Sequence, residues 1–343
     1  MPACIATSSA TFSRRVEAVR ARFERWLLAH WYGSPGVLCL LWPLELLVRT
    51  VARLRVRRIR RDPPVPVIVV GNLAVGGSGK TPLVIWLAEE MQARGFRVGI
   101  VSRGYGGTGP FPLVVGAKTD PVACGDEPAL IARRTGLPVV VGPDRVAALL
   151  LLVEQGVDVV VSDDGLQHVA LPRTVEIVVV DAQRGHGNGH CLPVGPLREP
   201  LSRLRTVDFV VSNGDELAGS VPMGLLPRIF RRVDDPRIEL SPDAFMARHG
   251  ARVSAVAGIG NPSRFFDTLR RLGYAPVEHP FPDHHRYRAD DLALPSPVVM
   301  TSKDAVKCAG LVGADSWYLD IAVELPADFL PALLRRAGLE DVA

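Results

Sequence analysis

Residues 74–82, AVGGSGKTP, combine three glycines with a lysine and a threonine, the residue types that hold phosphate groups. Glycines allow successive backbone amides to point inward at an anion. Lys80 is expected to bridge the β- and γ-phosphates of a nucleotide, and the Thr81 hydroxyl is expected to bind Mg²⁺. The residues expected to contact the phosphates are Gly76, Gly77, Ser78, Gly79, Lys80 and Thr81.

The segments around this loop favour a phosphate-binding role. The apolar run at 66–70 predicts a buried strand, and 82–95 predicts a helix whose positive dipole end faces the loop. Pro82 suits the first helical turn, where no amide donor is needed. Ala74 replaces the first glycine of the G-x-x-x-x-G-K-[ST] pattern, so a glycine-rich turn with an incidental lysine is the alternative. The order of strand, loop and helix favours the phosphate loop.

A second group of candidate residues follows the apolar run at 158–162. Asp163 and Asp164 come at the end of this predicted strand, where a phosphate-loop protein places its Mg²⁺-associated aspartate. An Asp-Asp-Gly turn is the alternative interpretation. The phosphate loop upstream favours the metal-associated role.

Transfer of a phosphoryl group also needs a side chain that accepts the proton of the attacking hydroxyl. The acidic and imidazole groups available are Asp126, Glu127, Asp283, His284 and His285. Acidic residues at 126–127 also suit a helix N-terminus, and paired loop histidines are often structural. Sequence alone therefore makes these residues candidates without choosing between them.

The cysteines indicate neither a disulfide framework nor a zinc site. The five cysteines are scattered and form no C-x-x-C pair, which fits a reducing compartment. His186, His190 and Cys191 lie close together in the sequence, but no second ligand cluster at zinc spacing accompanies them.

The chain of 343 residues is 48% apolar and is long enough for more than one domain. Strands and helices alternate from about 63 to 215, which predicts a doubly wound, mainly parallel sheet of the P-loop NTPase-like α/β class. Beyond residue 217 the elements become shorter and predict a second, smaller α/β domain. The expected division is therefore 1–62, 63–216 and 217–343.

The N-terminal segment has the composition of a membrane-surface helix. No charged residue occurs from Trp26 to Leu44, and six arginines lie within 53–61. Because GSPG at 33–36 and Pro43 interrupt the apolar stretch, a helix lying in the membrane interface fits better than a membrane span. A helix packed on the protein's own core is the alternative. Nucleic-acid binding is disfavoured because no groove-reading or aromatic elements are interleaved with the arginines.

Taken together, several motifs resemble the tetraacyldisaccharide 4′-kinase family, the lipid A biosynthesis kinases of Gram-negative bacteria. The matching stretches run from 67 to 308 in the family's order. They are VIVVGNLAVGGSGKTP, SRGYGG, GDEP, SDDGLQH, RGHGNGHCLPVGPLREP, FPDHH and MTSKDAVKC. Ser302 departs from the glutamate expected in the last of these motifs.

The resemblance implies transfer of the γ-phosphate of ATP, with Mg²⁺, to the 4′-hydroxyl of tetraacyldisaccharide 1-phosphate. It implies that Asp126 is the catalytic base and that His284 tunes it. Glu127 and Asp163 would lie close to the metal, and Asp164 close to the acceptor.

Three further residues are hypothetical acceptor contacts because of their charge and loop position, namely Arg103, Asn188 and Arg198. The resemblance also implies that the N-terminal helix reaches a lipid acceptor at the membrane surface. The expected location is the cytoplasmic face of the inner membrane, peripheral or monotopic. Neither a nucleic acid nor an obligate protein partner is predicted.

The alternative function is a P-loop GTPase or ATPase that acts as a switch or metallochaperone without a small-molecule acceptor. No N/T-K-x-D guanine-reading motif follows a suitable strand, and no C-x-C or C-x-x-C pair is present, which disfavours both. A third interpretation is a membrane scaffold that binds nucleotide without turnover.

Overall fold

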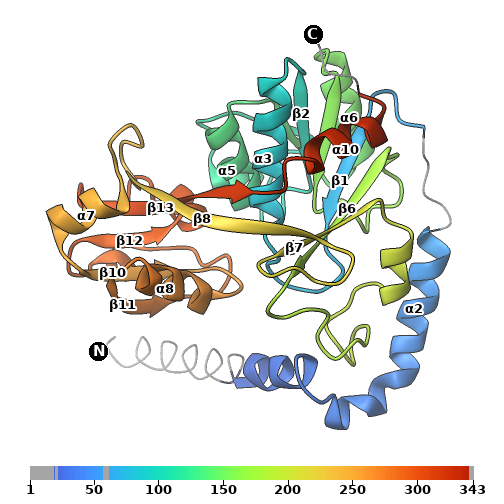
Figure 1. Ribbon diagram of the computed structural model, residues 1–343, viewed down its shortest axis with the longest axis horizontal. Coiled ribbons are helices and arrows are strands. Elements are labelled where there is room, and N and C mark those ends of the chain that lie inside the picture. The colour runs from blue at the N-terminus through green and yellow to red at the C-terminus, as the bar shows by residue number, and fades with distance from the viewer. Residues whose placement is uncertain (1–18, 20–21, 57–61, 340–343) are drawn as a thin grey trace, which may run out of the picture. The chain divides into compact units, whose positions relative to one another are not determined.

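The computed structural model describes residues 19, 22–56 and 62–339 (Figure 1). They fall into two compact units. The N-terminal unit contains the described part of 1–57 together with 73–75 and 184–206. The sheet unit contains the described parts of 58–72, 76–183 and 207–343. The domain boundaries at 62/63 and 216/217 stay predictions.

All the named strands belong to the sheet unit. They are β1 (Val67–Gly71), β2 (Val98–Ser102), β3 (Leu113–Val115), β4 (Val139–Val141), β5 (Val159–Asp163), β6 (Val175–Asp181), β7 (Phe209–Asn213), β8 (Val221–Arg232), β9 (Glu239–Leu240), β10 (Arg252–Ala257), β11 (Ala275–Pro280), β12 (Val298–Thr301) and β13 (Ser316–Glu324). Their order in the sheet is β11-β10-β12-β13-β8-β7-β6-β1-β5-β2-β4-β3, with β9 paired to β8.

The sheet is mainly parallel, as predicted. Strands β4, β2, β5, β1, β6, β7 and β8 pair in parallel, with β3 antiparallel at one edge. Strands β11, β10, β12 and β13 form a second parallel set, whose β13 pairs antiparallel with β8. The long strand β8 therefore joins two sets of parallel strands, which are the two α/β regions expected from the sequence.

Helices cover both faces of the first set of strands. The helices of the sheet unit are α3 (Lys80–Ala93), α4 (Pro121–Cys124), α5 (Asp126–Thr135), α6 (Arg145–Glu154), α7 (Pro242–His249), α8 (Pro262–Arg271), η3 (Ala289–Leu292), α9 (Ser302–Cys308) and α10 (Phe329–Ala337). Leu83 and Leu87 of α3 share one core with Ile68 and Ile100 of the strands. An added Cβ on Gly99, which alternates with Ile100 along β2, would meet Leu152 of α6, so α6 lies on the opposite face.

The helix predicted after the phosphate loop is present as α3, and one apolar face of it is buried. This face consists of Val84, Leu87, Ala88 and Met91, all fully buried. Carboxyl ends of neighbouring parallel strands meet at one edge of a sheet. The fold therefore brings the loop after β1 and the aspartates that end β5 to the same edge, because these two strands are paired.

The N-terminal unit contains a helix at 22–31, the 3₁₀ helix η1 (Gly36–Leu41), α2 (Trp42–Val56) and η2 (Leu201–Arg205). The helix at 22–31 ends before GSPG, so the apolar stretch is not one unbroken helix, as predicted. No helix within the described residues is long and apolar enough to cross a membrane. Most of the basic run at 53–61, and Arg14, Arg15 and Arg20, lie outside the described residues.

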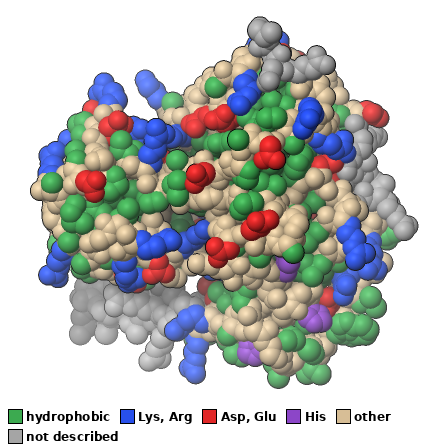
Figure 2. All heavy atoms as spheres, in the orientation of Figure 1, with side chains coloured by type: hydrophobic (Ala, Val, Ile, Leu, Met, Phe, Trp, Pro, Cys, Tyr) green, Lys and Arg blue, Asp and Glu red, His purple; other side chains and the backbone are tan. Residues whose placement is uncertain are grey.

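Helix α2 exposes its leucines and buries its carboxylate. Leu44 and Leu47 are 53% and 61% exposed, whereas Glu45 is fully buried. Within the unit, Glu45 accepts hydrogen bonds from the Cys191 amide and interacts with His190 Nδ1 at 2.8 Å. Hydrophobic side chains accordingly gather over η1 and α2 on the surface shown in Figure 2.

Candidate active site

The phosphate loop is shaped by two asparagine side chains of the sheet unit. Asn72 Nδ2 donates to Gly76 O at 3.0 Å, and Asn213 Nδ2 donates to Ser78 O at 3.0 Å. Gly79 has a φ of +94°, a left-handed conformation that glycine adopts readily, and an added Cβ there would collide with Asn213. Helix α3 begins at the next residue, so its free amides face the loop.

Lys80 reaches toward the carboxylates that follow β5. Its Nζ lies 3.5 Å from Asp164 Oδ1. Asp164 has a φ of +49°, an unfavourable backbone conformation for a non-glycine residue. Arg145 Nη1 donates to the Asp164 carbonyl at 2.7 Å and supports this turn. Strained backbone of this kind is concentrated at functional sites.

Asp163 is a fully buried carboxylate in a negative environment. Ser102 Oγ donates to Asp163 Oδ2 at 3.4 Å, and among the described residues Asp163 Oδ1 has no hydrogen-bond partner. Burial, together with the charges of Glu127 and Asp164, raises the pKa of Asp163 to about 7. Lys80 and Arg145 act in the opposite direction but do not compensate.

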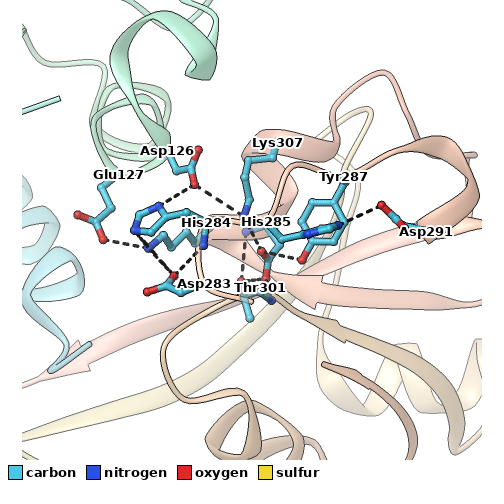
Figure 3. A network of polar contacts seen from close by, with 12 residues as sticks. Asp126, Glu127, Asp283, His284, His285, Tyr287, Asp291, Thr301 and Lys307 are labelled. Atoms are coloured by element: carbon cyan, nitrogen blue, oxygen red, sulfur yellow. Dashed lines mark hydrogen bonds and ion pairs between the residues drawn. The ribbon is translucent and has the colours of Figure 1, made fainter. Parts of the chain in front are cut away.

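Asp126 and His284 meet from distant parts of the sequence (Figure 3). His284 Nδ1 lies 3.2 Å from Asp126 Oδ2, and the imidazole ring packs against Tyr105 with 5.3 Å between ring centroids. Burial opposes ionisation of Asp126, but the His284 hydrogen bond and the charge of Lys307 lower its pKa overall. Like Asp164, His284 has a left-handed backbone, with φ at +59°.

Two lysines of α9 stabilise the negative groups around this pair. Lys303 Nζ lies 3.1 Å from Glu127 Oε1 and 3.2 Å from Asp283 Oδ1. Lys307 Nζ lies 3.7 Å from Asp126 Oδ2 and 3.0 Å from Asp304 Oδ1. Burial lowers the pKa of Lys303, but the nearby carboxylates outweigh it and raise that pKa overall.

The position of Lys303 also indicates which ring nitrogen of a neutral His284 carries the proton. Lys303 Nζ lies 3.5 Å from His284 Nε2. Because an ammonium group can only donate, Nε2 is the acceptor and Nδ1 carries the hydrogen that is donated to Asp126.

His285 has a different environment from its neighbour. Its Nε2 lies 3.1 Å from Asp291 Oδ2, and its ring stacks on Phe281. Tyr287 donates to the buried Asp304 at 2.9 Å and so completes a structural network behind the site (Figure 3). Of the two histidines that the sequence left open, His284 is therefore the one in contact with Asp126.

The loop and the Asp126–His284 pair belong to one contiguous region. An added Cβ on Gly260 would lie 3.3 Å from the Gly77 amide nitrogen and 3.5 Å from Asp283 Oδ2. Asp283 binds Lys303, and Lys303 binds Glu127. Phosphate loop, metal candidates and candidate base are thus linked within the sheet unit.

The remaining predicted residues are placed as follows. Thr81 lies in the first turn of α3, and Arg103 is exposed after β2. Arg198 belongs to the N-terminal unit, where its amide donates to Leu73 O. Asn188 lies in the same unit and donates to His30 O and Val194 O. These bonds give Asn188 a structural role in its loop, and its contact with the acceptor stays a prediction.

The predicted metal ligands fit a divalent cation by their donor atoms and by the negative charge of the two carboxylates. Thr81, Glu127 and Asp163 bring oxygen donors, which Mg²⁺ prefers. A cation would relieve the repulsion that raises the pKa of Asp163 and would bind its unpartnered oxygen. No group of three or more His, Cys, Asp or Glu side chains with metal-binding geometry occurs within the described residues.

Lys303 and Lys307 are site residues that were not predicted from the sequence. Both lie in the motif MTSKDAVKC, four residues apart. Residues with this spacing share a helix face, which is the signal that could have paired them with the carboxylates. Ser302, where the motif departs from the family pattern, is the first residue of α9.

Comparison with known proteins adds independent information. A family model described as tetraacyldisaccharide-1-P 4′-kinase matches residues 37–338. A tetraacyldisaccharide 4′-kinase of Alcanivorax borkumensis is 52% identical, over 92% of this chain and 98% of its own length. One from Alkalilimnicola ehrlichii is 55% identical, over 81% of this chain and 86% of its own length. The crystal structure of LpxK from Aquifex aeolicus in complex with ATP is 29% identical, with a TM-score of 0.74, and covers 88% of this chain and 99% of that chain.

Proposed function

The chain belongs to the tetraacyldisaccharide-1-P 4′-kinase family, and from this premise we propose that it transfers the γ-phosphate of ATP to the 4′-hydroxyl of tetraacyldisaccharide 1-phosphate. This is a step of lipid A biosynthesis. The observation that carries the proposal is the Asp126–His284 pair in the same contiguous region as the phosphate loop. A switch protein needs the loop but has no need of a base for a sugar hydroxyl.

The phosphates of ATP bind at residues 76–81. The backbone amides of the loop and the N-terminus of α3 orient them, and Lys80 neutralises the charge that spreads over the γ-phosphate during transfer. Asp163, Glu127 and Thr81 would hold Mg²⁺, which supplies further charge neutralisation when bound. Asp163 is then ionised because the cation offsets its burial.

Asp126 accepts the proton of the 4′-hydroxyl as the oxygen attacks the γ-phosphorus and ADP departs. Its net lowered pKa keeps it ionised and able to accept at neutral pH. His284 Nδ1 holds the carboxylate in position by donating a hydrogen bond to it. Lys303 fixes the imidazole orientation from the other side of the ring.

The acceptor is amphipathic, so it must be taken from a membrane surface. Arg103, Asn188 and Arg198 contact its phosphate and sugar groups in this proposal, and Asp164 contacts the hydroxyl-bearing sugar. The exposed leucines of α2 and η1 support docking on a membrane surface, which in this proposal is the cytoplasmic face of the inner membrane, with the protein peripheral or monotopic.

The test is an assay with purified, detergent-solubilised protein, labelled Mg-ATP and tetraacyldisaccharide 1-phosphate. We expect label in the lipid with the wild-type chain and at least a hundredfold lower rate with Lys80→Ala or Asp126→Asn. Asp126→Asn should still bind ATP, because its carboxylate acts on the acceptor. Asp158→Asn, which alters an exposed ion pair with Arg97, is the matched control.

Two results would argue against the proposal. Nucleotide hydrolysis without lipid labelling by the wild-type chain would favour a switch protein. Near wild-type transfer by Asp126→Asn would remove Asp126 from the role of base while leaving the reaction in place.

A further inference from the structure

A charged side chain from α8, in the C-terminal half of the sheet unit, reaches the residue that shapes the phosphate loop. Arg264 Nη2 donates to Asn213 Oδ1 at 2.6 Å, and Arg264 Nη1 lies 3.6 Å from Asp181 Oδ2. Asn213 in turn donates to Ser78 O of the loop. We infer that Arg264 is a positioning residue for ATP binding, which acts on the phosphate loop through Asn213. This inference rests on the proposed nucleotide site.

The geometry around Asn213 leaves it little freedom. Asn213 ends β7 and is 2% exposed, and both ends of its side-chain amide are used: Oδ1 accepts from Arg264 and Nδ2 donates to Ser78 O. Its Nδ2 also packs against Gly79 so closely that a Cβ could not be placed there. A rotation of this amide would therefore move Ser78 and Gly79, the residues whose backbone surrounds the phosphates.

Arg264 fixes which way the Asn213 amide points. A guanidinium group can only donate, so it selects the carbonyl oxygen of Asn213 and leaves Nδ2 for Ser78 O. Hydrogen bonds to charged groups are stronger than neutral ones. Asp181 holds the guanidinium itself, since its carboxylate is buried at the end of the neighbouring strand β6.

A second contact connects the same region of the chain to the loop. Gly260, in the turn before α8, lies against Gly77, as an added Cβ there would be 3.3 Å from the Gly77 amide nitrogen. The turn before α8 thus approaches the phosphate loop directly at Gly77, and α8 reaches Ser78 through Asn213. The C-terminal half of the chain supplies His284 to the candidate base and, through Arg264, also supports the nucleotide-binding loop.

The consequence for binding follows from population. If the loop adopts its binding-competent shape for only a fraction of the time, the apparent affinity for nucleotide falls by that fraction. Losing Arg264 should therefore weaken ATP binding through the shape of the loop, without requiring a contact between Arg264 and ATP. Once ATP is saturating, the loop is held by the ligand, and turnover should recover.

The first experiment measures calorimetric binding of Mg-ATP to the full-length chain without acceptor. We expect about a tenfold higher Kd for Arg264→Ala, and an intermediate value for Arg264→Lys, which keeps a donor for Asn213 but loses the fork that also reaches Asp181. KM for ATP should rise in parallel, with kcat changed by less than about threefold. Arg271→Ala is the control, because Arg271 is exposed on the same helix and donates to Thr268.

A double-mutant cycle separates an action through Asn213 from a direct one. In the Asn213→Ala background, Arg264→Ala should have little further effect on Kd. Fully additive effects would overturn the inference, because they would mean that Arg264 acts on the nucleotide directly. An unchanged Kd with a lowered melting temperature would also overturn it and leave Arg264 a purely structural residue.

The binding results are independent of the proposed transfer reaction, because Kd is measured without acceptor. Wild-type binding of ATP without labelling of the lipid would refute the acceptor and leave the role of Arg264 standing. An unchanged Kd in Arg264→Ala, with normal transfer by the wild-type chain, would refute the role of Arg264 and leave the proposed transfer reaction standing.

Discussion

At the scale of single residues, the buried carboxylates of the candidate site have opposite tendencies. Burial and neighbouring negative charges raise the pKa of Asp163 to about 7, whereas Asp126 keeps a lowered pKa through His284 and the lysines of α9. A bound cation would relieve the negative charge around Asp163, whereas Asp126 is ionised at neutral pH without one, as the proposed roles of metal ligand and base require. The division of roles follows from their environments, since both side chains are the same.

Replacing Asp163 by Asn should stabilise the metal-free protein at high pH. The folded-state pKa of Asp163 lies above the ordinary value, so the contribution of Asp163 to stability is most favourable below about pH 4 and is lost as pH rises toward 7. The Asp163→Asn variant does not lose this stability, because asparagine does not ionise. Its free energy of unfolding should match the wild type near pH 4 and exceed it by roughly 1–4 kcal/mol at pH 8, measured by urea denaturation.

Added Mg²⁺ at pH 8 should narrow this difference by stabilising only the wild-type chain. Asp158→Asn is a control with the opposite sign, because the Arg97 hydrogen bond lowers the pKa of Asp158, an exposed group. The small destabilisation caused by Asp158→Asn should be present at pH 8 and disappear as pH falls through the lowered pKa of Asp158. A wild-type stability that does not fall between pH 4 and 7 relative to Asp163→Asn would contradict the assigned environment of Asp163.

Sequence reasoning reached many site residues because their chemistry is coded in short motifs. The spacing of Lys80 and Thr81 and the position of Asp163 after an apolar strand follow from local physical requirements. The contact of Asp126 with His284 could not be derived locally, since 158 residues separate them. Only the family resemblance paired these two residues.

At the scale of elements, the parallel strands were predictable and the antiparallel pair was not. Continuous runs of valine and isoleucine mark β1, β5 and β6 as strands buried on both faces. Strand β8 contains Pro222, Gly224 and Pro227, residue types that are disfavoured within strands. Its pairing with β13 was therefore not predicted from the sequence. The register shift near Pro227 shows how the sheet accommodates it.

Helix α2 is an element whose polarity is inverted with respect to an ordinary surface helix. It buries Glu45 and exposes leucines, so its apolar side is available for a membrane. Substituting Leu44 and Leu47 by lysine should reduce binding to vesicles of neutral lipid by at least tenfold, because each leucine contributes about 1.5–3 kcal/mol when buried. Vesicle co-sedimentation with the full-length chain measures the effect.

Leu226→Lys provides the matched control for this prediction. Leu226 is 47% exposed, but it lies on β8. Strand β8 belongs to the sheet unit, whereas α2 belongs to the N-terminal unit. The substitution of Leu226 should leave vesicle binding unchanged. Equal losses in both variants would show that binding depends on general surface hydrophobicity, and unchanged binding in the α2 variant would assign the leucines another partner.

At the scale of the whole molecule, the sheet unit combines the predicted nucleotide-binding core and the smaller C-terminal domain. The sheet continues from β7 to β8 by parallel pairing and from β8 to β13 by antiparallel pairing. The shorter elements expected beyond residue 217 predicted a boundary there, but hydrogen bonds between strands β7 and β8 pass from one side of that position to the other. We therefore expect the two halves to unfold together.

Three buried thiols can report on this cooperativity. Burial raises the pKa of Cys124 to about 11 and that of Cys308 to about 12, and both belong to the sheet unit, on either side of residue 217. Burial also raises the pKa of Cys191, in the N-terminal unit, to about 11. Each thiol should resist alkylation at pH 7.5 until its own unit opens, because the thiolate is the reacting form.

Alkylation in increasing urea, read by peptide mass spectrometry, would then distinguish the units. Cys124 and Cys308 should become reactive at the same urea concentration, whereas Cys39, which is exposed, should react without urea and serve as the internal control. Separate midpoints for Cys124 and Cys308 would mean that the strand pairing through β8 does not make one cooperative unit. In that case the boundary at 216/217 would mark an independently folding domain, and the position of His284 beside Asp126 would depend on how that domain docks.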